Sequence, residues 1–269
     1  MDCALLHGFN KPVTLGESMV RAITIGDANA YALQAMMCSR AYAGDTNRAL
    51  FPVEELGWDK VGFPGYPSPS IHENSYFPKS ILGKIFSNLQ FDIWEKQNSK
   101  ETIVAFRGTD EKIDWIAGNF ALGISVPYKS AKKKVKEYCD LNPDRQVSLT
   151  GHSLGGGIAL SVSVWLALPA VVFNTSPRIF DGMRNKKSTA ARVAIFQHGD
   201  ILQWVRTRWL KSIEDTTAGN IIETHFRYPK GESNHRMNLL AEGILRAAHL
   251  QAYADIAKNI PVKFQVPPM

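Results

Sequence analysis

Residues 147–160 read VSLTGHSLGGGIAL. The β-like run VSLT leads into a Gly-x-Ser-x-Gly pattern, from Gly151 to Gly155, and a run of small and apolar residues typical of a helix follows. In such a strand–turn–helix arrangement the serine stands on a sharp turn, with its hydroxyl exposed at the end of a sheet. The stretch therefore predicts Ser153 as a nucleophile and the N–H of Leu154 as a donor to an oxyanion. A phosphate-cradling turn is the alternative, but no Lys follows the glycines as a P-loop requires.

Strands and helices alternate after this stretch. Strands are expected at 146–150, 170–174, 191–197 and 221–228, and helices at 154–168 and 237–257. Such alternation indicates a mostly parallel sheet with helices on both faces, so the predicted fold class is α/β.

The part of the chain before this stretch predicts three further features. A helix is expected at 27–43 with Asp27 as its N-cap, and a β-hairpin at 89–95 and 101–106. Residues 50–79 are rich in Pro and Gly and predict a long surface loop that leaves one domain and returns to it. A helix at 130–139 carries a basic face, which is either solvated or directed at a membrane; its lysines are Lys132, Lys133, Lys134 and Lys136.

Length and composition exclude several classes of protein. The chain has 269 residues, of which 45% are hydrophobic and 21% charged, so disorder and collagen-like repeats are excluded. Its net charge of +6 fits an enzyme, an anionic membrane surface or weak nucleic-acid binding, but no nucleic-acid-binding module is recognisable. The three cysteines are scattered, and no Cys/His cluster has metal-ligand spacing. We therefore expect no metal and no cofactor.

The N-terminal residues predict no export through the Sec route. Residues 1–10 have no basic segment followed by an apolar stretch, and no run of 18 apolar residues occurs anywhere. We expect a cytoplasmic protein, or one that is exported by a route other than Sec.

The strand at 102–106 runs into Arg107, Gly108 and Thr109. In a site built around a nucleophile turn, the second oxyanion donor comes from the loop after such an earlier strand. Thr109 is therefore expected to complete the oxyanion hole with Leu154.

Five motifs together resemble the class 3 lipases, the fungal triacylglycerol lipase-like family of the α/β-hydrolases. They are IVAFRGTD (103–110), IDWIAGN (113–119), TGHSLGG (150–156), NTSPRIF (174–180) and HGDILQWV (198–205). The resemblance covers about residues 28–250 and implies a single α/β-hydrolase domain over 1–269. It also implies a lid at about 110–120 whose Trp115 and Ile116 contact lipid, although an amphipathic segment there could equally be a permanently packed helix. Where the family has a His-Gly-Phe element, this chain has VPYKSAKKKVKEY (126–138).

The serine needs a general base, and the base needs a carboxylate to orient it. In α/β-hydrolases the chain order is Ser, Asp or Glu, then His. Asp200 directly follows the predicted strand 191–197 and is preferred to Asp181 and Asp215. His235 opens the last helix after a loop and matches the placement in the family; His225, inside a β-like run, and His249, inside the last helix, are the alternatives.

These residues predict a serine ester hydrolase that acts on lipids, as a lipase or phospholipase, through an acyl-enzyme. The expected partner is a lipid or ester substrate, with transient contact to a membrane surface and no nucleic acid. Two alternatives use the same fold: an acyltransferase or small-ester esterase with the same triad, and a catalytically inactive lipid-binding protein.

Overall fold

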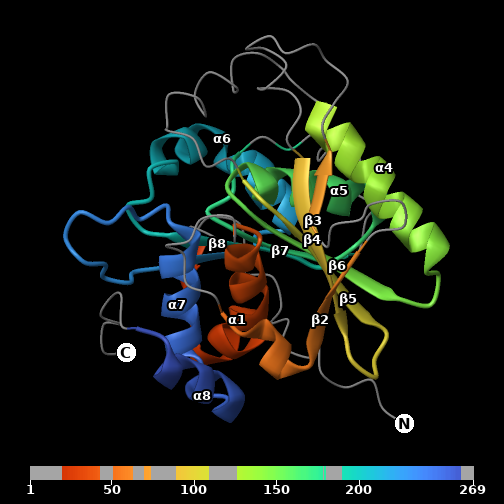
Figure 1. The fold of residues 1–269 in the computed structure, drawn as a ribbon. Helices are drawn as coiled ribbons and strands as arrows, with labels where there is room; N and C mark the ends of the chain where they lie inside the picture. Colours follow the sequence, from red (N-terminus) through yellow and green to blue (C-terminus); the bar gives the residue numbers. More distant parts are fainter. Residues whose placement is uncertain are drawn as a thin grey trace, which may run out of the picture.

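The computed structural model describes residues 20–42, 51–62, 70–73, 89–108, 126–177, 179 and 190–261. Nine strands of the described chain form one sheet in the order β1-β9-β8-β7-β6-β5-β4-β2, with β3 also paired to β4 (Figure 1). The strands are β1 (Val20–Ala22), β2 (Trp58–Val61), β3 (Ser70–Glu73), β4 (Leu89–Lys96), β5 (Glu101–Phe106), β6 (Gln146–His152), β7 (Ala170–Phe173), β8 (Arg192–Gln197) and β9 (Ile221–Thr224).

The sheet is mostly parallel. All pairs from β5 to β1 along the sheet are parallel, whereas β4 is antiparallel to β5, β2 and β3. The β4–β5 pair is the hairpin that the sequence predicted. Parallel strands place all their carboxyl ends at one edge, so residues that follow β5, β6 and β8 can meet there.

Helices cover both faces of the sheet, as Figure 1 shows. They are α1 (Ile25–Arg40), α4 (Val126–Leu141), α5 (Leu154–Leu166), α6 (Gln203–Thr217), α7 (Met237–Ala247) and α8 (Gln251–Asn259), with a short 3₁₀ helix at Val53–Leu56. Along β5, Ile103 and Ala105 pack with the core under α1 and α7, while Val104 and Phe106 pack with the core under α4 and α5. This two-residue alternation is expected for a strand buried on both faces, and it confirms the predicted α/β fold class.

The Pro- and Gly-rich stretch 50–79 is not simply the loop that its composition predicted. Within it the structure describes the 3₁₀ helix and the strands β2 and β3, both paired with β4. These strands are only four residues long, and pairing with β4 supplies the hydrogen bonds that their own sequence does not signal.

Helix α1 begins two residues before the predicted N-cap, Asp27. Thr24 caps the helix: its hydroxyl accepts a hydrogen bond from the Asp27 N–H at 3.2 Å, and the Asp27 carboxylate accepts one from the Thr24 N–H at 2.9 Å. This reciprocal capping box makes Asp27 the third helical residue.

The single C-terminal helix predicted at 237–257 is two helices, α7 and α8. The break lies at 248–250, where the N–H groups of His249 and Leu250 both donate to the side-chain oxygen of Asn29, at 2.7 and 3.2 Å. A side chain on α1 thus satisfies backbone groups that a continuous helix would pair internally. Among the described helices, none is both long and apolar enough to cross a membrane.

Candidate active site

Ser153 stands on the turn between β6 and α5 with a left-handed backbone, φ 57° and ψ −124°. A Cβ atom on Gly151 would lie 2.3 Å from the carbonyl oxygen of Gly155, and one on Gly155 would lie 2.4 Å from that of Phe106. Both distances are far below van der Waals contact, so the two glycines of the motif are required by close backbone approach. The turn is the strand–turn–helix geometry that the sequence predicted for Ser153.

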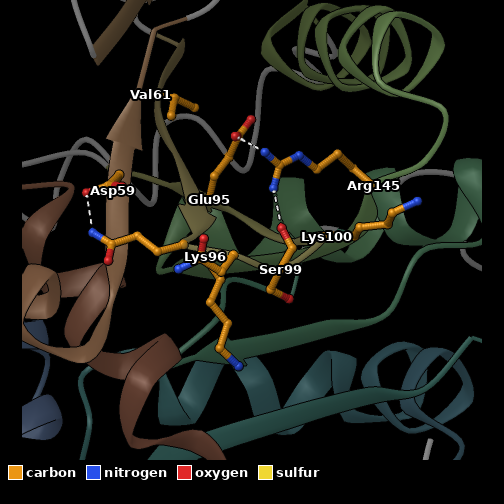
Figure 2. Close-up of a pocket in the computed structure, with 9 residues that line it drawn as sticks. Asp59, Val61, Glu95, Lys96, Ser99, Lys100 and Arg145 are labelled. Carbon is orange, nitrogen blue, oxygen red and sulfur yellow. Dashed lines mark hydrogen bonds and ion pairs between the residues drawn. The ribbon is translucent and has the colours of Figure 1, made fainter. Parts of the chain in front are cut away.

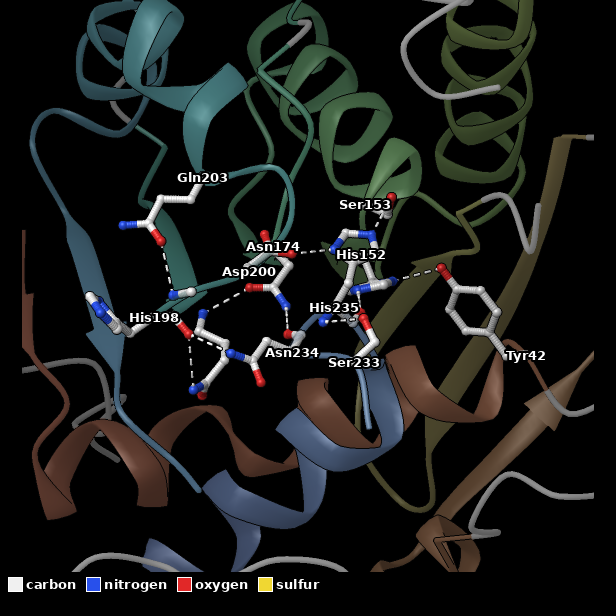
Figure 3. A network of polar contacts seen from close by, with 12 residues as sticks. Tyr42, His152, Ser153, Asn174, His198, Asp200, Gln203, Ser233, Asn234 and His235 are labelled. Atoms are coloured by element: carbon white, nitrogen blue, oxygen red, sulfur yellow. Dashed lines mark hydrogen bonds and ion pairs between the residues drawn. The ribbon is translucent and has the colours of Figure 1, made fainter. Parts of the chain in front are cut away.

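Ser153, His235 and Asp200 form one hydrogen-bonded chain at the carboxyl edge of the sheet (Figure 3). The Ser153 Oγ lies 2.9 Å from His235 Nε2, and His235 Nδ1 lies 2.6 Å from Asp200 Oδ1. The Asp200 side chain is fully buried and that of His235 is 17% exposed. The structure therefore brings together the three residues that the sequence selected from distant positions.

The rival candidates lie elsewhere. His225 pairs with Glu223 at 3.4 Å, and His249 lies at the break between α7 and α8. Asp215 is exposed on α6, and Asp181 is outside the described residues. Along the chain the order is Ser, Asp, His, and together with the parallel sheet this is the arrangement of the α/β-hydrolase fold.

The turn after β8 holds Asp200. The Asp200 N–H donates to the carbonyl of Gln197 at 3.1 Å, and the Gln203 N–H donates to the carbonyl of Asp200 at 2.8 Å. Burial raises the pKa of the neighbouring Tyr228 phenol, and the carboxylates of Asp200 and Glu242 raise it further. Tyr228 therefore remains a neutral phenol beside the buried carboxylate.

Two asparagines hold the loop that carries His235, and neither was expected from the sequence. The Asn174 side chain donates to the carbonyl of Asn234 at 3.2 Å and accepts from the N–H of Gln197 at 2.8 Å. The Asn234 side chain donates to the carbonyl of His198 at 3.0 Å (Figure 3). Asn174 opens the NTSPRIF motif, so the motif was a signal although its role was not evident.

Tyr42 and His152 form a second chain of hydrogen bonds behind the first. The Gly108 N–H donates to the Tyr42 hydroxyl at 2.8 Å, the hydroxyl lies 2.7 Å from His152 Nδ1, and His152 Nε2 lies 2.8 Å from the carbonyl oxygen of His235. A carbonyl only accepts, so His152 Nε2 is the donor in its contact with the His235 carbonyl. His152 is the variable residue of the Gly-x-Ser-x-Gly pattern, and the sequence gave no signal for this role.

The segment that is expected to supply the second oxyanion donor lies against Ser153. A Cβ atom on Gly108 would lie 2.9 Å from the Ser153 Cβ and 2.7 Å from the carbonyl oxygen of His152. The N–H of Leu154 is the first of helix α5, and the first N–H groups of a helix have no partner within it. Thr109 and the expected lid, with Trp115 and Ile116, lie outside the described residues.

A hollow of about 400 Å³ lies at the opposite end of the sheet, around the turn between β4 and β5 (Figure 2). Its charged lining residues have partners: Arg145 bonds Glu95 and the carbonyl of Ser99, and Lys96 bonds Glu101 outside the lining. Because Glu101 is in register with Gln146, at the start of β6, this hollow is separated from Ser153 by the length of the strand. It is not the site built around Ser153.

Cys38 offers no alternative nucleophile. Cys38 is buried, with its sulfur 3.0 Å from the Thr150 hydroxyl. Burial raises the pKa of the Cys38 thiol to about 12, so the thiolate does not form at neutral pH.

Comparison with known proteins gave one family and a set of similar folds. The model of a Tle-like phospholipase domain matches residues 34–227, which include Ser153 and Asp200 and end before His235. A fungal lipase–inhibitor complex is 14% identical, with a TM-score of 0.47 over 68% of this chain and 76% of that one. Lipase II from Rhizopus niveus is 15% identical, with a TM-score of 0.48 over 70% and 79%, and the Lip2 lipase from Yarrowia lipolytica is 17% identical, with 0.45 over 70% and 76%. No curated protein matches this chain significantly.

Proposed function

The chain belongs to the Tle-like phospholipase family, and from this premise we propose that it cleaves acyl esters of phospholipids with Ser153 as nucleophile. Membership of this family agrees with the resemblance to lipases that the motifs indicated. The observation that carries the proposal is the hydrogen-bonded chain Ser153–His235–Asp200, with distances of 2.9 and 2.6 Å.

His235 has the position of the general base. Asp200 is ionised in this mechanism and accepts a hydrogen bond from Nδ1–H, which leaves Nε2 free to take the proton of the serine hydroxyl. The carboxylate then stabilises the imidazolium that forms. Because the Asp200 side chain is fully buried, water screens this interaction little.

Ser153 attacks the acyl carbonyl, and the negative charge moves to the carbonyl oxygen. The N–H groups of Leu154 and Thr109 are proposed to bind this oxyanion, each lowering the barrier by about 3 kcal/mol. His235 returns its proton to the leaving lysophospholipid oxygen, and water then cleaves the acyl-enzyme with His235 again as base. Fatty acid and lysophospholipid are the products.

The basic face of helix α4 is less suited to binding a membrane than its number of lysines suggested. Lys136 pairs with Asp140 at 2.6 Å, and Lys134 pairs with Glu137 at 3.4 Å. Lys132 lies over the ring of Trp165. Two of the four positive charges are therefore locally compensated, which favours a solvated helix over a membrane-facing patch.

Product analysis on defined lipids tests the proposed reaction. We expect the protein to release fatty acid from vesicles of phosphatidylcholine or phosphatidylglycerol, measured by mass spectrometry, and to release none when Ser153 is replaced by Ala. Parallel assays with a triacylglycerol emulsion and with a lysophospholipid show which class of lipid the protein prefers. Added sodium chloride tests whether the rate depends on electrostatic attraction to the lipid surface. Acyl ester in place of fatty acid when an alcohol is added would instead indicate an acyltransferase. Absence of any Ser153-dependent product would contradict the proposal.

Tyr42→Phe removes the hydroxyl that joins Gly108 to His152. We expect kcat on a soluble ester to fall about 10-fold, with little change in KM. Without the hydroxyl, the segment at Gly108 and the backbone of His235 are held less firmly, and both contribute to stabilising the transition state rather than to binding the substrate. Tyr31→Phe, on helix α1 just before Tyr42 in the chain, is the matched control and should retain the wild-type rate. Equal rates for all three proteins would show that the Tyr42–His152 chain is only structural.

A further inference from the structure

His198, Glu223 and His225 converge at the ends of β8 and β9, on residues that the proposed hydrolytic reaction does not use. His198 Nδ1 lies 3.2 Å from one carboxylate oxygen of Glu223, and His225 Nε2 lies 3.4 Å from the other. The two imidazole rings stack with centroids 4.6 Å apart. One nitrogen or oxygen atom from each residue lies within 4.8 Å of the others.

Strand pairing explains why these three side chains share a face. Phe196 is in register with Glu223, and the N–H of His198 donates to the carbonyl of Thr224 at 2.8 Å, so the pairing continues one residue beyond β8. Side chains two residues apart on a strand point to the same side, which places Glu223 and His225 together and His198 opposite them. The intervening residues, Gln197 and Thr224, point inward and bond each other at 2.9 Å.

We propose that His198, Glu223 and His225 bind a divalent transition-metal ion of the zinc type. Two imidazoles and one carboxylate are a donor set that suits Zn²⁺, Ni²⁺ or Co²⁺ rather than Mg²⁺ or Ca²⁺, which prefer oxygen ligands. Tetrahedral Zn²⁺ with bonds of about 2.05 Å holds its ligand atoms about 3.3 Å apart. The distances of 3.2 and 3.4 Å, each from one imidazole to a different oxygen of the Glu223 carboxylate, are close to this value, and one nitrogen or oxygen atom from each residue lies within 4.8 Å of the others.

The exposure of the two imidazoles and the charge of the three side chains also favour a divalent metal ion. The side chains of His198 and His225 are 56% and 55% exposed, so the rings can turn to bring their nitrogens closer and a cation can enter from solvent. Two neutral imidazoles and one carboxylate leave a bound dication with a net charge of +1, and water completes the coordination. The sequence predicted no metal site because 25 residues separate His198 from Glu223, and only the β8–β9 pairing joins them.

The site is next to the proposed catalytic acid but does not share a side chain with it. His198 is two residues before Asp200, and in Figure 3 its ring points away from Asp200 and His235. A bound ion would fasten the end of β8 to the end of β9 and so restrain the turn that carries Asp200. The proposed role is therefore structural: the ion holds the ends of the two strands together. This role does not depend on which reaction the protein catalyses.

Titration of the full-length, untagged protein with ZnCl₂ alone tests the proposal by calorimetry and by thermal unfolding. We expect one ion per chain and a rise in Tm of about 5 °C when Zn²⁺ exceeds its Kd about 100-fold. His225→Ala and Glu223→Gln should each weaken binding about 100-fold or more. Co²⁺ should give the visible absorption bands typical of an ion with a low coordination number in the wild-type protein, and not in these variants. Addition of 5 mM Mg²⁺ or Ca²⁺ should leave the Tm of the wild-type protein unchanged.

Two further variants separate this site from other imidazoles. His249→Ala removes an exposed histidine outside the cluster, and His235→Ala removes the imidazole beside Ser153; both should retain the stoichiometry and the affinity of the wild-type protein. Loss of binding in His235→Ala would assign the ion to the triad and overturn the proposal. Unchanged binding in folded His225→Ala and Glu223→Gln proteins, or no binding to the wild-type protein at millimolar Zn²⁺, would overturn it as well.

Discussion

Replacement of Ser153 by Ala is expected to lower kcat for ester hydrolysis by about 10⁵-fold while leaving the fold intact. The substitution removes the only atom that can form the acyl-enzyme in the proposed mechanism, whereas the oxyanion donors and the lipid-binding surface remain. Alanine adds no volume at this 1%-exposed position, so packing around the turn is preserved. Steady-state kinetics on a soluble p-nitrophenyl ester measure the effect, and circular dichroism checks the fold.

Ser176 provides the matched control for this experiment. It is 2% exposed, its N–H donates to the carbonyl of Ser153, and among the described residues its hydroxyl has no hydrogen-bond partner. Ser176→Ala should therefore keep the wild-type rate within about twofold and should still react with a fluorophosphonate probe, whereas Ser153→Ala should not react. A folded Ser153→Ala protein with wild-type activity would refute Ser153 as the nucleophile.

Asp200→Asn should lower kcat by about 10⁴-fold, with a smaller change in KM. The amide group occupies nearly the same volume as the carboxylate, so the 2.6 Å contact with His235 can persist. An amide N–H directed at Nδ1, however, stabilises the tautomer with its proton on Nε2, and this tautomer cannot accept the serine proton. The amide also provides no negative charge for the imidazolium. Rates measured across a range of substrate concentrations separate kcat from KM.

Asp215→Asn tests whether the effect belongs to the buried carboxylate. Asp215 is the other acid considered in the described chain, and it is exposed on α6. We expect Asp215→Asn to match the wild-type protein in both kinetic constants. Similar rates for Asp200→Asn and Asp215→Asn would rule out the orienting role of Asp200.

Local sequence signals were sufficient for the central part of the fold. The alternation from β6 to β9, the β4–β5 hairpin and the turn at Ser153 follow from short patterns, such as apolar runs bounded by Gly and Pro. The meeting of Ser153 and Asp200 also followed, because parallel strands place their carboxyl ends at one edge, whereas His235 was chosen for its position after a loop and its match to the family.

The features that the sequence missed depend on contacts between distant segments. β2 and β3 exist as strands because β4 offers an edge for them, which their Pro- and Gly-rich surroundings do not indicate. The end of α7 depends on Asn29 of α1, and the link between Gly108 and His235 depends on Tyr42 and His152. None of these pairs is adjacent in sequence, and each residue alone resembles an ordinary surface or core residue.

The residues that meet in the site are far apart in the sequence, and this affects how the protein folds. The Ser153–His235 hydrogen bond spans 82 residues, His235–Asp200 spans 35, and Tyr42–His152 spans 110. Such non-local pairings slow folding, because the loops between them must close. Helices and the β4–β5 hairpin can form while the serine, the imidazole and the carboxylate are still apart. A chain in which these loops have not yet closed lacks the serine–imidazole–carboxylate contacts that the proposed hydrolysis requires.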